Sequence, residues 1–348
     1  MLEQFKEQIR TGKPLRIRGG GSKDFYGQAL NGEVLDTRGH AGIVAYEPTE
    51  LFVTAKCGTP LAEIETALAV QGQCLSFEPP RFSPDSTIGG VVAAGLSGPR
   101  RASAGALRDY VLGVKIIDGE GRELTFGGQV MKNVAGYDVS RLIAGSFGTL
   151  GLITEVTLKV LPKPVTEATL RFEMAQGEAL GQLNAWGSQP LPIVASCWQN
   201  GVLTLRLGGA RAALESATRK LGGEKVGADG TAFWGDLRDQ ELPFFAAETL
   251  WRLSVPSVAP QIELPGEQLI EWGGALRWLK SDASPERIRA AAVSLGGSAM
   301  LYRAPDSLKA QVGAIAPLSA PLLKLHKNLK AAFDPRGIFN PGRMYLDF

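Results

Sequence analysis

The stretch from Ser83 to Gly151 decides the fold, because small, backbone-exposing segments stand at both of its ends. It opens with Ser83-Pro84-Asp85-Ser86-Thr87-Ile88-Gly89-Gly90 and closes with Gly145-Ser146-Phe147-Gly148-Thr149-Leu150-Gly151. Glycine has no Cβ atom, so its N–H group can approach a ligand closely, and serine and threonine add hydroxyl donors. We therefore expect this stretch to wrap a cofactor that carries a diphosphate.

A further glycine-rich segment lies nearer the N-terminus. The alternating residues 14–18 predict a strand, which runs into Gly19-Gly20-Gly21-Ser22-Lys23. This is not a P-loop, which needs G-x-x-x-x-G-K-[ST], and it is not a Rossmann fingerprint, because Asp24 stands where the third glycine should be. Taken alone, the segment fits a phosphate cradle and a bare turn equally well.

The composition limits the function classes. The chain has 348 residues, 44% hydrophobic and 21% charged, with a net charge of +2, which fits a globular protein of two domains and does not indicate nucleic-acid binding. Its three cysteines form no C-x-x-C pair, which argues against a disulfide framework or a metal site and favours a reducing cytoplasm. We expect no signal peptide and no membrane-spanning helix, and a peripheral place in a membrane-associated complex stays open.

The order of the predicted elements suggests three parts. Residues 1–164 read as a βαβ-like start followed by a helix from Thr87, whose N-terminus would attract phosphate through its dipole and free N–H groups. Pro162-Lys163-Pro164 is a stiff break. Residues 165–310 alternate strands and helices in an α+β order with an antiparallel sheet and no internal repeat. Residues 311–348 form a helix with a leucine stripe and a compact tail that docks back on another element.

Four motifs in this order resemble the PCMH-type (vanillyl-alcohol-oxidase) flavoproteins. They are Gly19-Gly20-Gly21-Ser22, Pro84-Asp85-Ser86-Thr87-Ile88-Gly89-Gly90, Gly145-Ser146-Phe147-Gly148-Thr149-Leu150-Gly151-Leu152-Ile153-Thr154-Glu155 and Asp334-Pro335-Arg336-Gly337-Ile338-Phe339-Asn340-Pro341-Gly342. Three more segments are similar to the E-type FAD-binding subunits of bacterial glycolate oxidases: Gly98-Pro99-Arg100-Arg101, residues 130–138 and residues 269–279. The resemblance implies an α+β protein with a two-lobed PCMH-type FAD-binding domain and a ferredoxin-like antiparallel cap.

The resemblance also assigns the cofactor contacts. It implies that the FAD pyrophosphate is held by two segments, Gly19 to Lys23 and Ser86 to Gly90, the second preceded by Pro84 and Asp85. Ser97 and Gly98 would lie along the flavin. The adenosine end would be lined by Gly148, Thr149, Gly151 and Ile153. Covalent members of the family attach the flavin to a histidine in the first loop, and this loop has none, so we expect FAD to be bound without a covalent bond.

The chain differs from the catalytic members of the family in the residue that would act as the catalytic base. Oxidation of a 2-hydroxy acid needs a group that takes the hydroxyl proton and a cation that binds the carboxylate. Catalytic relatives supply an imidazole from a His-Gly-x-Gly-Asp-Gly-Asn type segment, whereas the two histidines here, His40 and His326, stand in no such segment. The resemblance therefore implies a subunit that acts with two partners, a homologous catalytic FAD subunit and an iron–sulfur subunit, on a small 2-hydroxy acid such as glycolate.

Several interpretations stay open. Arg100 and Arg101 are either an anion site or a solvated basic pair, and Lys132 and Asn133 are either near the flavin or part of a polar loop. Asn340 and Arg343 either reach the flavin pocket or only dock the tail. For the whole chain, one alternative is a self-sufficient FAD dehydrogenase of a small hydroxy acid such as D-lactate. The other is an assembly subunit that binds no flavin.

Overall fold

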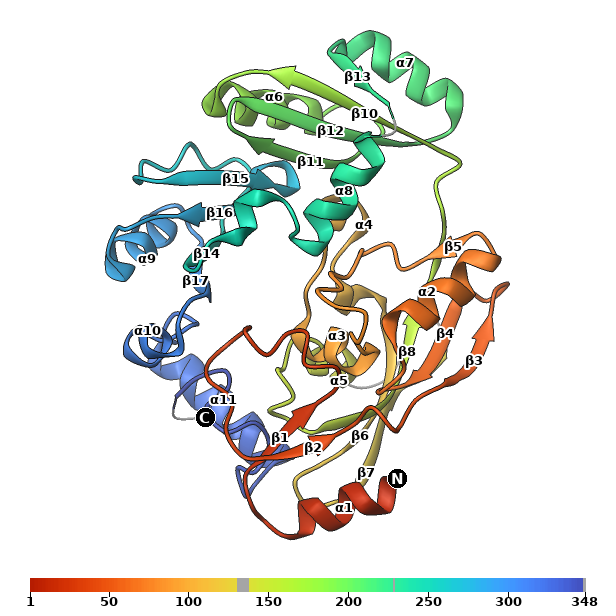
Figure 1. The fold of residues 1–348 in the computed structure, drawn as a ribbon, viewed down its shortest axis with the longest axis vertical. Helices are drawn as coiled ribbons and strands as arrows, with labels where there is room; N and C mark the ends of the chain where they lie inside the picture. The colour runs from red at the N-terminus through yellow and green to blue at the C-terminus, as the bar shows by residue number, and fades with distance from the viewer. Residues whose placement is uncertain (130–137, 228, 347–348) are drawn as a thin grey trace. The chain divides into compact units, whose positions relative to one another are not determined.

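The computed structural model describes residues 1–129, 138–227 and 229–346, and these form two compact units. Unit 1 comprises Met1–Ser97, Ala106–Pro162 and Asp306–Phe348, and unit 2 comprises Gly98–Gly105 and Lys163–Pro305. Figure 1 shows the course of the chain through both. The short piece Gly98–Gly105, which follows the central glycine-rich segment in sequence, therefore belongs to the second unit.

Unit 1 is built on a five-stranded antiparallel sheet. In spatial order its strands are β3 (Ile43–Glu47), β4 (Phe52–Lys56), β8 (Leu152–Lys159), β6 (Val111–Ile117) and β7 (Glu123–Gly127). The central strand β8 is buried at six of its eight positions, since both of its faces are covered. Helix α2 (Leu61–Val70) places Leu61, Ile64 and Leu68 into the core of this sheet, as its helical spacing predicts.

A smaller lobe of unit 1 joins the two ends of the chain. Strands β1 (Leu15–Arg18) and β2 (Glu33–Asp36) pair in parallel beside helix α1 (Leu2–Arg10). Phe5, Ile9 and Leu15 share a core with Ile338 and Phe339 of the tail. The predicted docking of the tail on another element is thus confirmed, and the element is the first strand.

The βαβ-like interpretation of the N-terminal part is wrong. No helix connects β1 to β2, and the strand after α2, β5 (Gln73–Cys74), pairs with β9 (Leu161–Pro162) in an antiparallel two-stranded sheet. Alternation of apolar residues locates a strand but does not tell which strand it pairs with or in which direction, because parallel and antiparallel strands have the same two-residue period.

Short helices fill the central stretch. They are α3 (Ile88–Ala94), α4 (Arg101–Ala104), η1 (Leu107–Tyr110) and α5 (Val139–Ile143). The side chain of Asp138 caps α5 by accepting a hydrogen bond from the Arg141 N–H. The predictions for Lys132, Asn133 and Tyr137 fall on residues 130–137, outside the described residues. The C-terminal segment of unit 1 adds α10 (Asp306–Val312) and α11 (Ala320–Phe333).

Unit 2 is one antiparallel sheet of eight strands made from two similar halves. The strands are β10 (Thr166–Glu173), β11 (Ile193–Gln199), β12 (Val202–Gly209), β13 (Glu224–Val226), β14 (Leu250–Ser254), β15 (Glu267–Glu271), β16 (Leu276–Lys280) and β17 (Ser298–Arg303). Their spatial order is β13-β10-β12-β11-β15-β16-β14-β17. Counted within each half, this is 4-1-3-2 followed by 2-3-1-4, so two ferredoxin-like arrangements meet edge to edge at β11 and β15.

The two halves carry different helices. The first has α6 (Gln176–Gly187) and α7 (Arg211–Leu221). The second has α9 (Pro285–Ser294), with irregular chain at 255–266 in place of the other helix, and η3 (Trp272–Gly274) joins β15 to β16. The ferredoxin-like antiparallel architecture is confirmed. The two halves share an order of strands without an internal repeat in the sequence, since a strand needs only apolar alternation to keep its place.

The sequence interpretation also missed helix α8 (Asp229–Asp239) and the 3-10 helix η2 (Pro243–Ala246). Residues 229–239 include two glycines and three aspartates, which are weak helix formers. The helix is held by burial instead: Trp234 is buried, and its indole N–H donates to the hydroxyl of Thr169 on β10.

Replacement of Leu68 by alanine tests the core of unit 1. The side chain is fully buried, so its loss removes apolar contacts and leaves a cavity, and we expect a destabilisation of about 2–5 kcal/mol. The matched control is Val70→Ala in the same helix, whose side chain is 78% exposed and whose loss should change little. Urea unfolding followed by circular dichroism compares the two, and equal midpoints would refute the assignment of the core.

Candidate functional site

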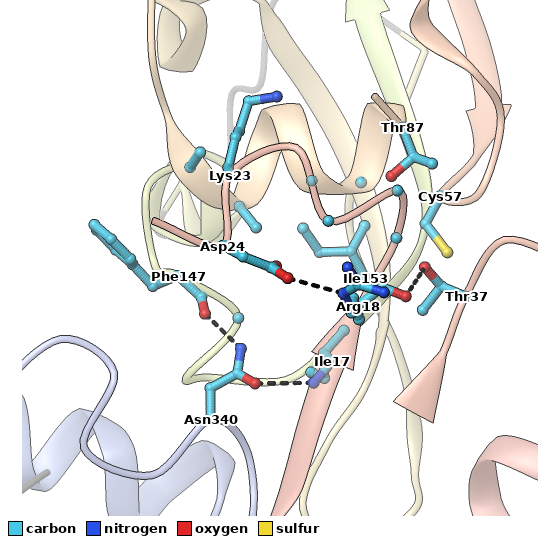
Figure 2. A pocket seen from close by; sticks show the side chains of 18 of the residues that line it. Ile17, Arg18, Lys23, Asp24, Thr37, Cys57, Thr87, Phe147, Ile153 and Asn340 are labelled. Carbon is cyan, nitrogen blue, oxygen red and sulfur yellow. Dashed lines mark hydrogen bonds and ion pairs between the residues drawn. The ribbon is translucent and has the colours of Figure 1, made fainter. Parts of the chain in front are cut away.

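A cleft in unit 1 brings together the glycine-bearing segments that the sequence singles out. It encloses about 790 Å³ of space, part of it open to solvent. Of the predicted site residues, it is lined by Gly19, Gly20, Gly21, Ser22, Lys23, Thr87, Gly89, Gly90, Gly148, Gly151 and Ile153. These residues come from three segments far apart in sequence, and Figure 2 shows side chains of the three segments around one hollow.

The first loop, Gly19 to Lys23, offers unused backbone donors to this cleft. Among the residues that the structure describes, the N–H groups of Gly20, Gly21 and Ser22 donate to no protein oxygen. Gly21 has a φ of +74°, a conformation that glycine adopts without cost. Successive N–H groups in such a turn form an anion-binding hollow, so the loop suits a phosphate better than a bare turn does.

Close contacts explain why this loop consists of glycine. A Cβ atom on Gly20 would lie 1.7 Å from the backbone oxygen of Asp85, and one on Gly19 would lie 2.1 Å from the hydroxyl oxygen of Thr87. The first and second segments are therefore in direct contact. The ammonium group of Lys23 strengthens the contact by donating to the hydroxyl of Ser86, with 2.9 Å between the atoms.

The second segment is held more tightly by the protein than its sequence suggests. The N–H groups of Ile88 and Gly89, at the start of α3, donate to the carbonyls of Thr59 and Cys57 at 3.0 and 2.8 Å. They are therefore not free for a ligand, contrary to the expectation of an open helix N-terminus. Gly89 is needed because a Cβ atom there would lie 2.7 Å from the Cβ of Cys57. Thr87 and Gly90 do face the cleft.

The third segment lines the cleft through Gly148, Gly151 and Ile153. Thr149 instead points inward: its hydroxyl donates to the Ser146 carbonyl, and its own carbonyl accepts from Lys330. Asn340 fastens this segment to the first strand. Its amide oxygen accepts from the Ile17 N–H at 2.9 Å, and its amide nitrogen donates to the Phe147 carbonyl at 2.6 Å, as Figure 2 shows.

The C-terminal tail holds segments of the cleft together as a clamp, and the sequence left this role of the tail undecided. Asn340 and Arg343 line the cleft and also dock the tail, so both of the alternative roles considered from the sequence are present. The Arg343 guanidinium donates to the carbonyls of Lys23, Asp24 and Gln28, behind the first loop. Burial lowers the pKa of Arg343 to about 10, so the group is still a cation at neutral pH and favours an anion in the cleft.

Other lining residues were missed at the sequence level: Ile17, Arg18, Asp24, Tyr26, Leu30, Thr37, Cys57, Ala93, Ala94 and Phe147. Among these, Arg18 forms an ion pair with Asp24 at 2.9 Å, which Figure 2 shows at the base of the first loop. The Tyr26 ring stacks on Phe147, with 4.7 Å between centroids. Proximity in sequence could have found four of them, since Ile17, Arg18, Asp24 and Phe147 lie within two residues of a predicted site residue.

Several predicted site residues lie outside the cleft lining. Ser86 is buried and binds Lys23, and Ile88 is a core side chain. Pro84 and Asp85 are exposed, although the Asp85 carbonyl abuts Gly20. The Ser97 hydroxyl accepts from the Leu107 N–H.

The segment that follows is fastened within unit 2. The Gly98 carbonyl accepts from the Trp272 indole, and the Arg101 guanidinium stacks over the Trp272 ring at 4.5 Å. Arg101 is thus not simply solvated.

Neither histidine reaches the cleft. The His40 ring packs edge-on against Phe5, and burial lowers its pKa. The His326 ring contacts Tyr345, and its Nδ1 donates a hydrogen bond to the Leu322 carbonyl on α11.

The thiol of Cys57 is the one cysteine sulfur on the described cleft lining, and burial raises its pKa to about 12. It is therefore protonated and a weak nucleophile at neutral pH. Within the described residues, no group of three His, Cys, Asp or Glu side chains is placed to hold a metal ion. Nor does the described part of the chain contain a helix long and apolar enough to cross a bilayer.

Unit 2 has a larger hollow, of about 1420 Å³, at the open end of β10 to β13. Its charged lining residues are Arg171, Glu173 and Glu224, so carboxylates outnumber cations there. A diphosphate would be repelled, which leaves the cleft of unit 1 as the better site for such a ligand despite its smaller volume.

Comparison with known proteins shows the family to which the chain belongs. Residues 6–127 match the family described as FAD binding domain, which covers the first two of the three segments. The chain is 51% identical over all of its 348 residues to the glycolate oxidase subunit GlcE of Escherichia coli (strain K12), and the match spans 97% of that protein. It is 38% identical over 125 residues, 36% of this chain and 27% of the other, to the glycolate oxidase subunit GlcD of Bacillus subtilis (strain 168).

A solved structure titled alkyldihydroxyacetonephosphate synthase has the same fold, with a TM-score of 0.67 over 98% of this chain and 73% of that one, at 16% identity. The two-unit α+β fold of this flavoprotein superfamily is thereby confirmed, and FAD is the cofactor that the matching domain binds.

Substitution of Gly20 by alanine tests the first loop. The added methyl group would overlap the Asp85 carbonyl and displace the loop, which costs roughly 1–3 kcal/mol, so we expect FAD affinity to fall about tenfold or more. Gly181→Ala is the control, because nothing lies within 4 Å of a Cβ atom there. FAD titration of the apoprotein by fluorescence quenching gives both affinities, and unchanged binding in the Gly20 variant would rule out this loop as a cofactor contact.

Replacement of Lys330 by methionine tests the clamp. It leaves the buried carboxylate of Asp334 without its cation, which costs about 3–5 kcal/mol, and it frees the Thr149 carbonyl from its anchor. We expect both lower stability and weaker FAD binding. Lys324→Met, on the exposed side of the same helix, should affect neither. Thermal unfolding with and without FAD separates the two effects, and identical midpoints for both variants would contradict the clamp.

Proposed function

Because the chain belongs to the family of the glycolate oxidase subunit GlcE, we propose that it is the FAD-binding subunit of a complex that oxidises glycolate to glyoxylate. The observation that carries the proposal is the 51% identity over the full length of both chains. The cleft of unit 1 supports it, since its unused N–H groups and buried Arg343 suit an anionic diphosphate.

We assign the FAD contacts by segment. Gly19 to Lys23 and the segment from Ser86 to Gly90 would bind the pyrophosphate, through the N–H groups of the first loop and the ammonium of Lys23. Gly148, Gly151 and Ile153 would line the adenosine end, and Ser97 would lie beside the flavin. The Asn340 and Arg343 side chains would hold these segments at the required separation rather than react.

We propose that the FAD is held without a covalent bond. The residues described as lining the cleft include no histidine, and the thiol of Cys57, with its pKa near 12, is poorly suited to attack a flavin.

We further propose that substrate oxidation takes place on a partner. Bound FAD accepts two electrons from an organic donor and can pass them on singly. Oxidation of glycolate also needs a base for the hydroxyl proton, and both histidines are occupied elsewhere in the structure, His40 against Phe5 and His326 against Tyr345. The partners in this proposal are a homologous catalytic flavoprotein subunit and an iron–sulfur subunit, in the cytoplasm or at the inner face of the membrane.

The absorption spectrum of the purified chain tests this function. We expect a flavin spectrum, release of all flavin into the supernatant on acid precipitation, and no bleaching by glycolate until the partner subunits are added. Bleaching of the isolated chain by glycolate or D-lactate would instead make it a self-sufficient dehydrogenase. A protein that stays colourless after incubation with FAD would make it an assembly subunit.

A further inference from the structure

Helix α11 exposes apolar side chains on the side that faces away from the core of unit 1. Among the described residues, four leucines are exposed, and three of them lie here: Leu322 at 48%, Leu325 at 54% and Leu346 at 60%. Leu322 and Leu325 are three residues apart and so share a face of the helix. The His326 ring contacts the ring of Tyr345, with 5.9 Å between centroids, so the residue that precedes Leu346 lies against the same helix.

This apolar patch, defined as Leu322, Leu325 and Leu346, has a basic surround. Apart from the buried Lys330, helix α11 contains the basic residues Lys324, His326 and Lys327, and it contains no aspartate or glutamate. Lys324 and Lys327 are exposed, next to the two helix leucines in sequence. An occupant of complementary chemistry has an apolar centre and a rim of carboxylates.

The helix presents the patch rigidly, because its inner side is anchored. Leu329 and Phe333 pack against the core of the five-stranded sheet, and the Lys330 ammonium donates to the carbonyls of Thr149 and Phe339. The helix cannot rotate to bury Leu322 and Leu325 without breaking these contacts. A fixed, partly apolar surface loses little conformational entropy when a partner covers it.

From these observations, and resting on the proposed function, we propose that the patch is the docking surface for the partner flavoprotein subunit, which contributes an apolar surface rimmed by aspartate and glutamate. A second copy of this chain fits less well, since an isologous contact would set the lysines of one α11 against those of the other. A membrane surface fits less well too, because the apolar face covers only about one turn of the helix and includes no tryptophan or phenylalanine.

The test co-expresses the chain with its partner subunits and compares Leu322→Glu/Leu325→Glu with wild type. Truncated interface anchors cost about 1–2 kcal/mol or more each, and glutamates would also face the partner's carboxylates, so we expect affinity for the partner to fall at least about 100-fold. Because both leucines are exposed, flavin content and thermal midpoint should stay as in wild type. Val70→Glu, at a side chain 78% exposed in α2, is the control and should bind the partner normally.

A second variant tests how far the two exposed lysines contribute to partner binding. Lys324→Glu/Lys327→Glu should slow association and reduce its dependence on salt, with little change in flavin content. Full partner binding by the leucine variant would overturn the docking surface while leaving the proposed function intact. A wild-type chain that binds FAD but no partner subunit would overturn both.

Two further measurements test whether a membrane or a second copy of the chain binds the patch instead. Wild-type chain that floats with vesicles of phosphatidylcholine and phosphatidylserine, and no longer floats after the leucine substitutions, would overturn the docking surface in favour of a membrane. A wild-type dimer in analytical ultracentrifugation that the leucine substitutions dissociate would overturn it in favour of a second copy.

Discussion

One buried ammonium group holds the cofactor cleft of this protein together. Lys330 donates three hydrogen bonds, to the Asp334 carboxylate at 2.8 Å, the Thr149 carbonyl at 2.7 Å and the Phe339 carbonyl at 2.8 Å. Desolvation lowers the pKa of this lysine, and the Asp334 carboxylate opposes that shift. Three acceptors satisfy all the donors of an ammonium group, which is the condition under which a buried cation is tolerated. The third segment of the cleft and the tail are thereby fixed to one helix.

The Asp334 carboxylate also fixes the course of the tail. It accepts from the N–H groups of Ile338 and Phe339, so that Phe339 enters the core beside Leu15 and Asn340 reaches both Ile17 and Phe147. The closing residues of the chain thus set the separation between the first loop and the third segment. A diphosphate cradle made of separate segments depends on such a clamp, because glycine loops have little packing of their own to hold their positions.

The sequence was informative where a local pattern has a local cause. Glycines at 19, 20, 89 and 148 stand where a Cβ atom would strike another segment, and the Asp138 cap and the helix 61–70 follow from nearest neighbours. It was uninformative where the cause is distant. Lys330 reads as one more lysine on an amphipathic helix until Thr149, 181 residues away, is placed beside it. The prediction of free N–H groups at the start of α3 was wrong for the same reason, since the carbonyls of Thr59 and Cys57 accept hydrogen bonds from them. Pairing direction and the duplicated halves of the eight-stranded sheet also depend on contacts that apolar alternation does not encode.

The two sides of helix α11 show how one element can serve both the cofactor and a partner. Its inner residues are committed to the core and to the Lys330 contacts, which fix the third segment of the cleft. Its outer leucines take no part in those contacts and stay about half exposed, so they are available to a partner. Since the inner contacts fix the helix orientation, a partner that binds the outer face meets a surface already in its bound form. The clamp that shapes the cleft therefore also preorganises the proposed docking face, and the two functions share the rigidity of one helix.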